Sequence, residues 1–331
     1  MRILVKSIFL IFVLSSHSRL LSADLDNVTF SQRLMGTDVK IVLNYGKCSD
    51  LEAAVKEAYL EGNRLNLIFS DYIADSELSK FSRSSNSVSS EKVKLSKELF
   101  EVLKYSLKLS SLSNGSFDPT LGPLSRLWRI SRHQRLFPEK SKLTNALARS
   151  GANYLKLDES QQTGQLLAPN MVLDLGGVAK GYIADRMLEV LQGYGFSRSL
   201  VDAGGDLRIG DAPLNSVGWK IDIGGRKYQK LTMLKLSNCA VATSGDTEQF
   251  LKVNATQYSH IIDPQTGIGL TNLAQATVIA PTGMEADSLA STFLVTGFEK
   301  ASTLIKKTNV RHLYYIEKRG DHTIFKDIHR D

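Results

Sequence analysis

The stretch from Met171 to Asp185 constrains the fold more than any other part of the chain. A short apolar run is followed by two adjacent glycines, Gly176 and Gly177, and then by apolar residues at the spacing of one helical face. We predict a buried strand over Met171–Leu175, a glycine turn, and a helix that ends near Gly193. Such a joint presents free backbone N–H groups and a helix N-terminus, which together can bind a phosphate.

Two charged side chains flank this turn. Asp174 offers a carboxylate to a metal ion or a hydroxyl group, and Lys180 offers an ammonium group to a phosphate. The common nucleotide signatures are absent, because Val178 stands where a dinucleotide fingerprint requires glycine, and Tyr182-Ile183 replace the Lys-Ser/Thr pair of a P-loop. In the alternative interpretation, the glycines serve only to pack the strand against the helix.

Residues 1–23 differ from the rest of the chain. Arg2 and Lys6 precede an apolar run over Ile8–Leu14, and Leu21-Ser22-Ala23 offers small residues for cleavage. The run is too short to span a bilayer, so we interpret residues 1–23 as a secretory signal peptide. We expect residues 24–331 to form a single domain that is exported to the periplasm.

The charge and the cysteine content argue against nucleic-acid binding and against a zinc site. Residues 1–23 hold three of the 41 basic residues and none of the 34 acidic ones, so their removal lowers the formal charge from +7 to +4. This small excess does not indicate a nucleic-acid-binding protein. The basic residues gather in segment 126–142, interpreted as a solvated helix or loop face, with an acidic partner or an anionic membrane surface as the alternative. Cys48 and Cys239 lack a histidine at zinc-ligand spacing, and whether they pair stays open.

The order of the expected elements favours an α+β fold with mixed or antiparallel sheets and packed helices. A hairpin is expected over Asp26–Asn44, whereas the prolines of segment 117–124 argue against a regular helix there. Helices are expected early and strands late, ahead of a final helix with a capping box. The expected helices are Asp50–Ser70, Ser96–Leu112, Leu143–Ser150 and Thr282–Leu294, and the expected strands are Ser199–Asp202, Leu207–Gly210, Trp219–Ile223, Thr232–Leu236, Ala240–Thr243, Tyr258–Ile262 and Gln275–Ala280.

Two further positions can carry chemistry. Asp287 and Ser291 are four residues apart on the last expected helix, so they share a face with two oxygen ligands of the kind that Mg²⁺ prefers. The alternative is an ordinary solvated helix face. His260 lies on an expected strand before the Asp263-Pro264 turn, where it is either structural or a general base.

Seven motifs in succession resemble the ApbE-like FAD:protein FMN transferases, over roughly residues 30–297. The motifs are Met35-Gly36-Thr37, Tyr72 with Ser76-Glu77-Leu78-Ser79, Phe117-Asp118-Pro119-Thr120, Asp174 to Gly181, Asp202 to Asp206, His260 to Pro264, and Ala286 to Ser291. The resemblance implies the ApbE-like, T-fold-related architecture. It also implies Mg²⁺-dependent transfer of the FMN half of FAD to a Thr or Ser hydroxyl of an acceptor protein, with release of AMP.

The resemblance also implies roles for individual residues. His260 would be the catalytic base, Asp287 a catalytic metal ligand, and Tyr72 would stack on the isoalloxazine ring. Ser291 stands where family members commonly have Thr, so it keeps the hydroxyl but loses the methyl group that restricts its rotamers. FAD would be bound by Met35, Tyr72, Ser116, Phe117, Asp118, Asp174, Lys180, His260 and Ile261, and Mg²⁺ by the Gly177 carbonyl, Asp287 and Ser291.

Two other functions fit the same residues. One is a Mg²⁺-dependent FAD pyrophosphatase, in which water replaces the acceptor hydroxyl and free FMN is formed. The other is an exported FAD-binding carrier without turnover. For the transferase, the family suggests acceptors among electron-transfer subunits of the Rnf complex or the sodium-pumping NADH:quinone reductase, close to the membrane.

Overall fold

The computed structural model describes residues 27–45, 49–86, 91–224, 233–245, 249–319 and 322–330. Its central element is an eight-stranded sheet in which every neighbouring pair is antiparallel. The strands, in sheet order, are β1 (Val28–Leu34), β2 (Thr37–Leu43), β6 (Ser199–Ala203), β7 (Asp206–Ile209), β10 (Cys239–Gly245), β13 (Ala274–Ala280), β14 (His312–Arg319) and β15 (His322–His329). The predicted α+β fold class is confirmed.

Three small sheets and the helices surround this sheet. The small sheets are β3 (Val93–Lys94) with β5 (Thr163–Leu166) and β4 (Leu155–Asp158), β8 (Trp219–Asp222) with β9 (Met233–Leu236), and β11 (Phe250–Val253) with β12 (Thr256–Ser259). The helices are α1 (Ser49–Phe69), α2 (Glu77–Arg83), α3 (Lys97–Leu112), α4 (Gly122–Gln134), α5 (Lys140–Ala148), α6 (Ala179–Gly193) and α7 (Gly283–Ile305). No described helix has the length and apolar character needed to cross a membrane.

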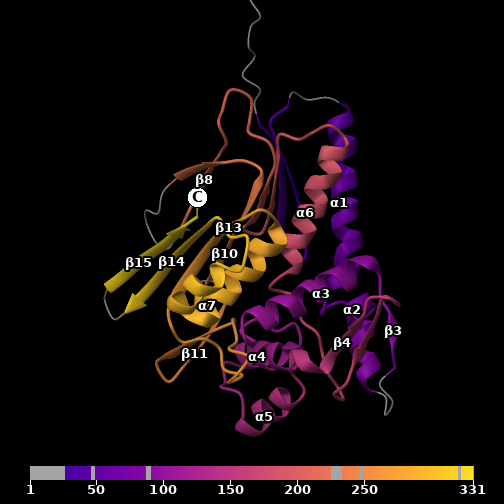
Figure 1. The fold of residues 1–331 in the computed structure, drawn as a ribbon, viewed down its shortest axis with the longest axis vertical. Helices are drawn as coiled ribbons and strands as arrows, with labels where there is room; N and C mark the ends of the chain where they lie inside the picture. The colour runs from indigo at the N-terminus through magenta and orange to yellow at the C-terminus, as the bar shows by residue number, and fades with distance from the viewer. Residues whose placement is uncertain are drawn as a thin grey trace, which may run out of the picture.

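The large sheet is covered on both faces. On one face α1 and α6 lie side by side and α7 runs along β10 and β13 (Figure 1). On the other face β8 contributes Trp219 and Ile221 to a second apolar cluster, against which Leu234 and Leu236 of β9 pack. All seven residues of β13 are therefore buried, and its polar side chains are paired: Thr277 with the Thr243 hydroxyl at 2.9 Å, and Gln275 with the Gly224 carbonyl at 3.0 Å.

Two glycines let α6 and α7 meet backbone to backbone. A Cβ atom at Gly181 would lie 2.0 Å from the Gly283 carbonyl oxygen, a distance that no side chain allows. The start of α7 is further fixed by Asp185 of α6, whose carboxylate accepts hydrogen bonds from the Gly283 N–H at 2.7 Å and the Met284 N–H at 2.9 Å. Burial raises the pKa of Asp185 to about 6, although these bonds and Arg208 act in the opposite direction.

A third apolar cluster joins α4 and α5 to the β11–β12 hairpin. Trp128 of α4 is fully buried, and its indole N–H donates to the Gly267 carbonyl at 2.8 Å. Its ring lies 5.6 Å from the rings of both Phe137 and Tyr258. The carboxyl end of α4 is thereby fixed against the hairpin, a contact that matters for the surface described below.

Most of the expected elements are present. The first hairpin is confirmed, and positive φ angles of 55° at Met35 and 76° at Gly36 identify its two-residue turn. The helix expected over Asp50–Ser70 is also confirmed. The final helix is present, with Thr282 accepting from the Glu285 N–H at 3.2 Å, but it continues past the predicted end at Leu294 to Ile305, with a positive φ of 70° at Gly297. The helix predicted over Leu143–Ser150 begins three residues earlier, at Lys140.

Three local predictions are wrong. Met171–Leu175 is buried but forms no ladder, because its backbone bonds go to loop atoms, such as the Asp174 N–H to the Pro119 carbonyl. Segment 117–124 is not helix-free: α4 begins at Gly122, with Pro123 in the first turn, where proline is tolerated. The strand expected over Tyr258–Ile262 ends at Ser259, so His260 lies just beyond it.

Some elements were not predicted, and some predictions concern residues that the structure does not describe. The sequence did not predict β14 and β15, which complete the large sheet, or the sheet of β3, β5 and β4. Cys239 is a buried free thiol, whereas Cys48 and the predicted signal peptide lie outside the described residues.

Candidate active site

The predicted metal ligands come together where the start of α6 meets α7. Asp287 and Ser291 lie one turn apart on α7. The Asp287 carboxylate accepts a hydrogen bond from the Gly181 N–H at 3.1 Å. A Cβ atom at Gly177 would lie 3.6 Å from the Ser291 hydroxyl oxygen, so the glycine turn faces that side chain directly. The Ser291 hydroxyl also lies 2.9 Å from that of Ser244 on β10.

A buried group of charges surrounds Asp287. The Lys180 ammonium forms an ion pair with Asp206, which is 5% exposed, and both act electrostatically on Asp287. Burial and the nearby Asp206 carboxylate raise the pKa of Asp287 to about 7, and Lys180 opposes this increase. Two carboxylates therefore share one ammonium group, so the group carries a net negative charge when ionised.

This arrangement suits a hard cation. The candidate donors are a carboxylate, a hydroxyl and a backbone carbonyl, all of them oxygen, and the net negative charge around Asp287 favours a divalent ion. Among the residues that the structure describes, no three His, Cys, Asp or Glu side chains converge as a metal-binding group. The donors at α6 and α7 include one carboxylate, that of Asp287. A single carboxylate is enough for Mg²⁺, because this ion often keeps waters and substrate phosphates as its other ligands.

A second cluster centres on Arg129 of α4. Its guanidinium contacts Asp71 at 2.5 Å and Asp174 at 3.3 Å, and lies 4.1 Å from the centre of the Tyr72 ring. Burial and the Asp174 carboxylate raise the pKa of Asp71, and Arg129 opposes both effects. Tyr72 itself is 77% exposed, so Arg129 supports one side of a ring that stays accessible to a ligand.

Asp174 links the two clusters. Its second oxygen accepts from the Gly176 N–H at 2.8 Å, within the glycine turn that leads to Gly177. Tyr72 and Asp174, distant in sequence and both predicted to bind FAD, are thus joined by Arg129 and connected to the α6–α7 junction.

The predicted loop at Ser116, Phe117 and Asp118 borders the same junction. The Phe117 ring is within 3.6 Å of the position that a Cβ atom of Gly177 would take. The Asp118 carboxylate is engaged within the fold, where it accepts from the Thr120 N–H at 2.8 Å and the Ala152 N–H at 3.1 Å. Burial raises its pKa despite these bonds. Asp118 therefore shapes the loop, and the backbone around it is what can face a ligand.

The hairpin turn that contains Met35 lies beside the Asp202–Asp206 turn. A Cβ atom at Gly204 would lie 2.5 Å from the Thr37 hydroxyl oxygen, and Val39 of β2 pairs with Ala203 of β6. Met35 is partly buried against the main core. It is therefore near the segment that supplies Asp206, the partner of Lys180.

His260 and Ile261 follow β12, on the hairpin that packs against α4. The His260 N–H donates to the Gln249 carbonyl at 3.0 Å, and its Nδ1 lies 3.2 Å from the same oxygen. A carbonyl oxygen only accepts hydrogen bonds, so this contact favours the tautomer with the proton on Nδ1 and Nε2 as the basic nitrogen. Ile261 is partly buried and packs against the main core.

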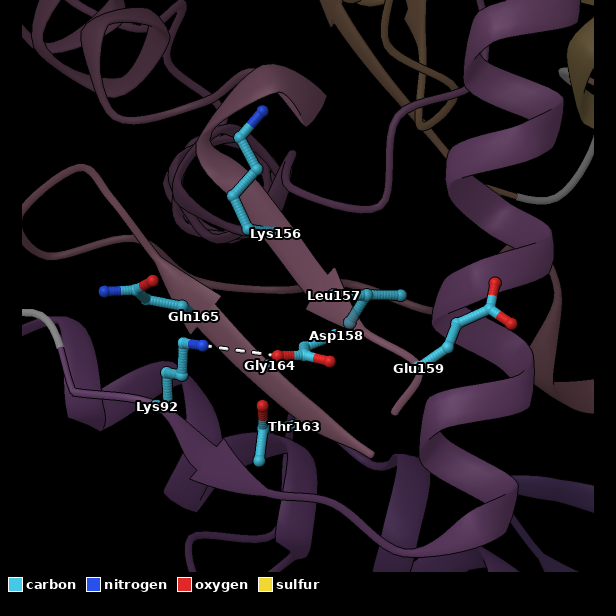
Figure 2. Close-up of a pocket in the computed structure, with 8 residues that line it drawn as sticks. All are labelled: Lys92, Lys156, Leu157, Asp158, Glu159, Thr163, Gly164 and Gln165. Carbon is cyan, nitrogen blue, oxygen red and sulfur yellow. Dashed lines mark hydrogen bonds and ion pairs between the residues drawn. The ribbon is translucent and has the colours of Figure 1, made fainter. Parts of the chain in front are cut away.

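Two surface hollows are lined by residues outside the two clusters described above. One of about 400 Å³ lies on the small sheet of β3, β5 and β4, where Lys92 pairs with Asp158 at 3.2 Å (Figure 2). None of its lining residues belongs to either cluster described above. The other, of about 300 Å³, lies between the end of α4 and β11, and its lining residue Arg132 interacts electrostatically with Arg129 and Tyr72. We place the candidate site at the α6–α7 junction and the Arg129 cluster, because the residues predicted to bind the metal and FAD come together there.

Sequence reasoning missed three residues of this arrangement. Arg129 was one of several arginines in a basic segment, and its spacing does not reveal that it reaches two carboxylates. Asp206 was part of a quoted motif but had no assigned partner until the structure placed Lys180 against it. Ser244 carries no signal in the sequence at all.

Comparisons with known proteins identify the family of the chain. The model of the ApbE family matches residues 35–314. The chain is 28% identical over 295 residues to the FAD:protein FMN transferase of Treponema pallidum, which covers 84% of this chain and 81% of that protein. It is 30% identical over 274 residues to the FAD:protein FMN transferase of Haemophilus influenzae, covering 79% and 75%.

The fold comparison gives the same result. The solved structure of the flavin transferase ApbE from Vibrio cholerae is 28% identical, with a TM-score of 0.79, and the match covers 91% of this chain and 97% of that one. Because the family model matches most of the chain and the solved ApbE structure has the same fold, the chain belongs to the ApbE family.

Proposed function

We propose that this protein transfers the FMN half of FAD to a Thr or Ser hydroxyl of an acceptor protein and releases AMP. The names of its relatives support flavin transfer in general. The observation that carries the proposal is the α6–α7 junction, where Asp287, Ser291 and Gly177 meet beside the Lys180–Asp206 pair. The site joins hard oxygen donors to a helix start, the combination that a pyrophosphate substrate requires.

The transfer exchanges the phosphoanhydride bond of FAD for a phosphoester bond to the acceptor. The acceptor hydroxyl oxygen forms a bond to the phosphorus on the riboflavin side of FAD, and the bond from that phosphorus to the bridging oxygen breaks. AMP leaves with the bridging oxygen. The hydroxyl proton goes to Nε2 of His260, which the Gln249 carbonyl contact favours as the basic nitrogen. The displacement needs positioning and charge stabilisation more than covalent chemistry by the protein.

Individual residues orient the substrate. The open side of the Tyr72 ring, backed by Arg129, would stack on the isoalloxazine. Asp174 would accept from hydroxyl or imide groups of FAD, while Lys180 and the Gly177 N–H would face its phosphates. Met35, the Ser116–Asp118 loop and Ile261 would complete the pocket.

Asp287, Ser291 and the Gly177 carbonyl would hold Mg²⁺. The ion, when bound, neutralises pyrophosphate charge and stabilises the charge that develops on the departing AMP. The raised pKa of Asp287 indicates that its charge is poorly compensated by the protein alone. The net negative charge of the Asp287–Lys180–Asp206 group supports this assignment.

We further propose that the protein acts in the periplasm, after removal of residues 1–23, on an electron-transfer subunit of the Rnf or sodium-pumping NADH:quinone reductase type. The charge and cleavage pattern of residues 1–23 supports export. An N-terminal mass measurement on the protein recovered from the periplasm tests this. A mature chain that begins at Asp24 is expected, and a full-length cytoplasmic chain would contradict export.

Product analysis tests the reaction. Residues 24–331 are incubated with FAD, Mg²⁺ and a candidate acceptor domain, and intact-protein mass spectrometry is combined with nucleotide chromatography. We expect acceptor that has gained FMN and an equal amount of AMP, with both lost on addition of EDTA. Free FMN and AMP without an adduct, across several acceptors, would identify a pyrophosphatase instead. FAD that stays intact and bound would identify a carrier.

A further inference from the structure

The hollow between the end of α4 and β11 is a surface that the proposed reaction does not use. It measures about 300 Å³ and is lined by Arg132, Arg135, Phe250, Leu251 and Lys252. Three of its five lining residues are cationic, and the other two are apolar. The end of α4 is fixed against the hairpin by the edge-to-face and tilted ring contacts among Trp128, Phe137 and Tyr258, so the two walls of the hollow are held in place.

The cations of this hollow differ from Arg129, their neighbour on the same helix. Arg129 is neutralised by two carboxylates. Among the described residues, by contrast, no carboxylate forms an ion pair with Arg132, Arg135 or Lys252. Arg132 is half-buried, and burial together with the charge of Arg129 lowers its pKa. A desolvated guanidinium without a carboxylate is stabilised when an external anion binds it.

The hollow also borders the place where an acceptor must dock. Arg132 is close enough to Tyr72 for the two to interact electrostatically, and Tyr72 is the exposed ring of the candidate site. The opposite wall continues along the hairpin to His260, whose N–H is bonded to Gln249, the residue that precedes Phe250. A protein whose hydroxyl approaches His260 would therefore cover this hollow.

We propose that this hollow is a docking site for an acidic segment of the acceptor protein, with a carboxylate against Arg132 and Arg135 and an apolar side chain against Phe250. The inference rests on the proposed transfer only for the identity of the partner. The combination of two adjacent arginines with an exposed apolar surface favours a polypeptide, because a free phosphate would not contact Phe250, which is 43% exposed.

Binding without turnover tests the inference. Two fluorescein-labelled peptides with a central Thr are compared, one flanked by Glu and Leu and the other by Gln and Leu, and fluorescence anisotropy is measured with residues 24–331. The Glu peptide is expected to bind more tightly, and its affinity to fall with added salt. The double variant R132Q/R135Q is expected to lose about tenfold in affinity for the Glu peptide and little for the Gln peptide.

A matched control removes a cation elsewhere. Lys156 is an exposed cation on β4, in the hollow of Figure 2, and K156Q should leave both peptide affinities unchanged. The melting temperature of each variant separates lost docking from a helix that is weakened at its carboxyl end.

Three results would overturn the proposal: no binding of the Glu peptide at millimolar concentration, equal losses for both peptides, or an equal loss in FAD affinity. The last would assign the hollow to the nucleotide. The FAD affinities of the wild type and the double variant are measured in the same samples. A failure of the proposed transfer shows as absence of flavinylated product in the product analysis, whereas a failure of docking shows in the peptide affinities, so the two are distinguishable.

Discussion

Replacement of Asp287 by Asn should make the metal-free protein more stable. The Asp287 side chain is 3% exposed, and its carboxylate accepts a hydrogen bond from the Gly181 N–H at 3.1 Å. Asn keeps an oxygen that can accept that bond, and it has nearly the same volume. The substitution therefore removes the charge and leaves the packing of α7 on α6 unchanged.

The magnitude follows from the pKa. A carboxyl group whose pKa rises from 3.8 to about 7 on folding destabilises the fold when ionised, by about 4 kcal/mol. This cost is absent below pH 4, grows as the pH rises, and is complete above pH 7 or so. This value already includes the attraction of Lys180. Asn returns part of the gain because its buried amide N–H₂ group needs acceptors that the carboxylate did not need. We expect a net stabilisation of about 2 kcal/mol at pH 8, or about 4 °C in melting temperature.

Thermal unfolding of wild type and D287N, in EDTA at several pH values, measures this. The difference should shrink towards zero at pH 4 and reach its full size at pH 8. Added Mg²⁺ should raise the melting temperature of the wild type and leave that of D287N unchanged. A variant that is less stable than the wild type at pH 8 in EDTA would refute the reasoning about the buried charge.

Two further substitutions test the architecture of the site. Gly181→Ala should abolish folding or lower the stability by several kcal/mol, because its methyl group would lie 2.0 Å from the Gly283 carbonyl oxygen. Gly193→Ala is the control: it has open space around it and should be neutral or slightly stabilising in thermal unfolding. Arg129→Met should weaken FAD binding about tenfold and cost about 2 kcal/mol of stability, because it leaves two nearby carboxylates without their cation and the Tyr72 ring without support. Fluorescence titration with FAD and urea unfolding measure both effects, and unchanged FAD affinity would separate Arg129 from the binding site.

The fold class could be predicted because local signals and the final arrangement agree. The Met35-Gly36 turn, the periodicity of α1 and the capping box of Thr282 each specify their element without help from distant residues. Met171–Leu175 shows the limit. Its apolar run is typical of a buried strand, but whether such a run joins a ladder depends on a neighbouring strand that its own sequence does not contain.

The candidate site divides in the same way. Asp287 and Ser291 could be paired from the sequence, because a four-residue spacing on a helix places them on one face. The contacts of Arg129 could not be predicted in this way, because 58 residues separate it from Asp71 and 45 separate it from Asp174. Contacts at such separation are set by packing of the whole domain. The resemblance to a family carried only residues within its motifs, so the arginines of α4 stayed outside it.

Transfer by D287N tests the central claim most directly. The flavinylation rate of an acceptor domain is measured for the wild type and D287N at saturating FAD and Mg²⁺, with FAD affinity determined on the same samples. We predict that D287N binds FAD within a few-fold of the wild type and loses transfer by about a hundredfold or more, because the junction of α6 and α7 then lacks its only carboxylate ligand for the cation. Transfer at the wild-type rate by a folded D287N protein would show that the reaction does not take place at this junction.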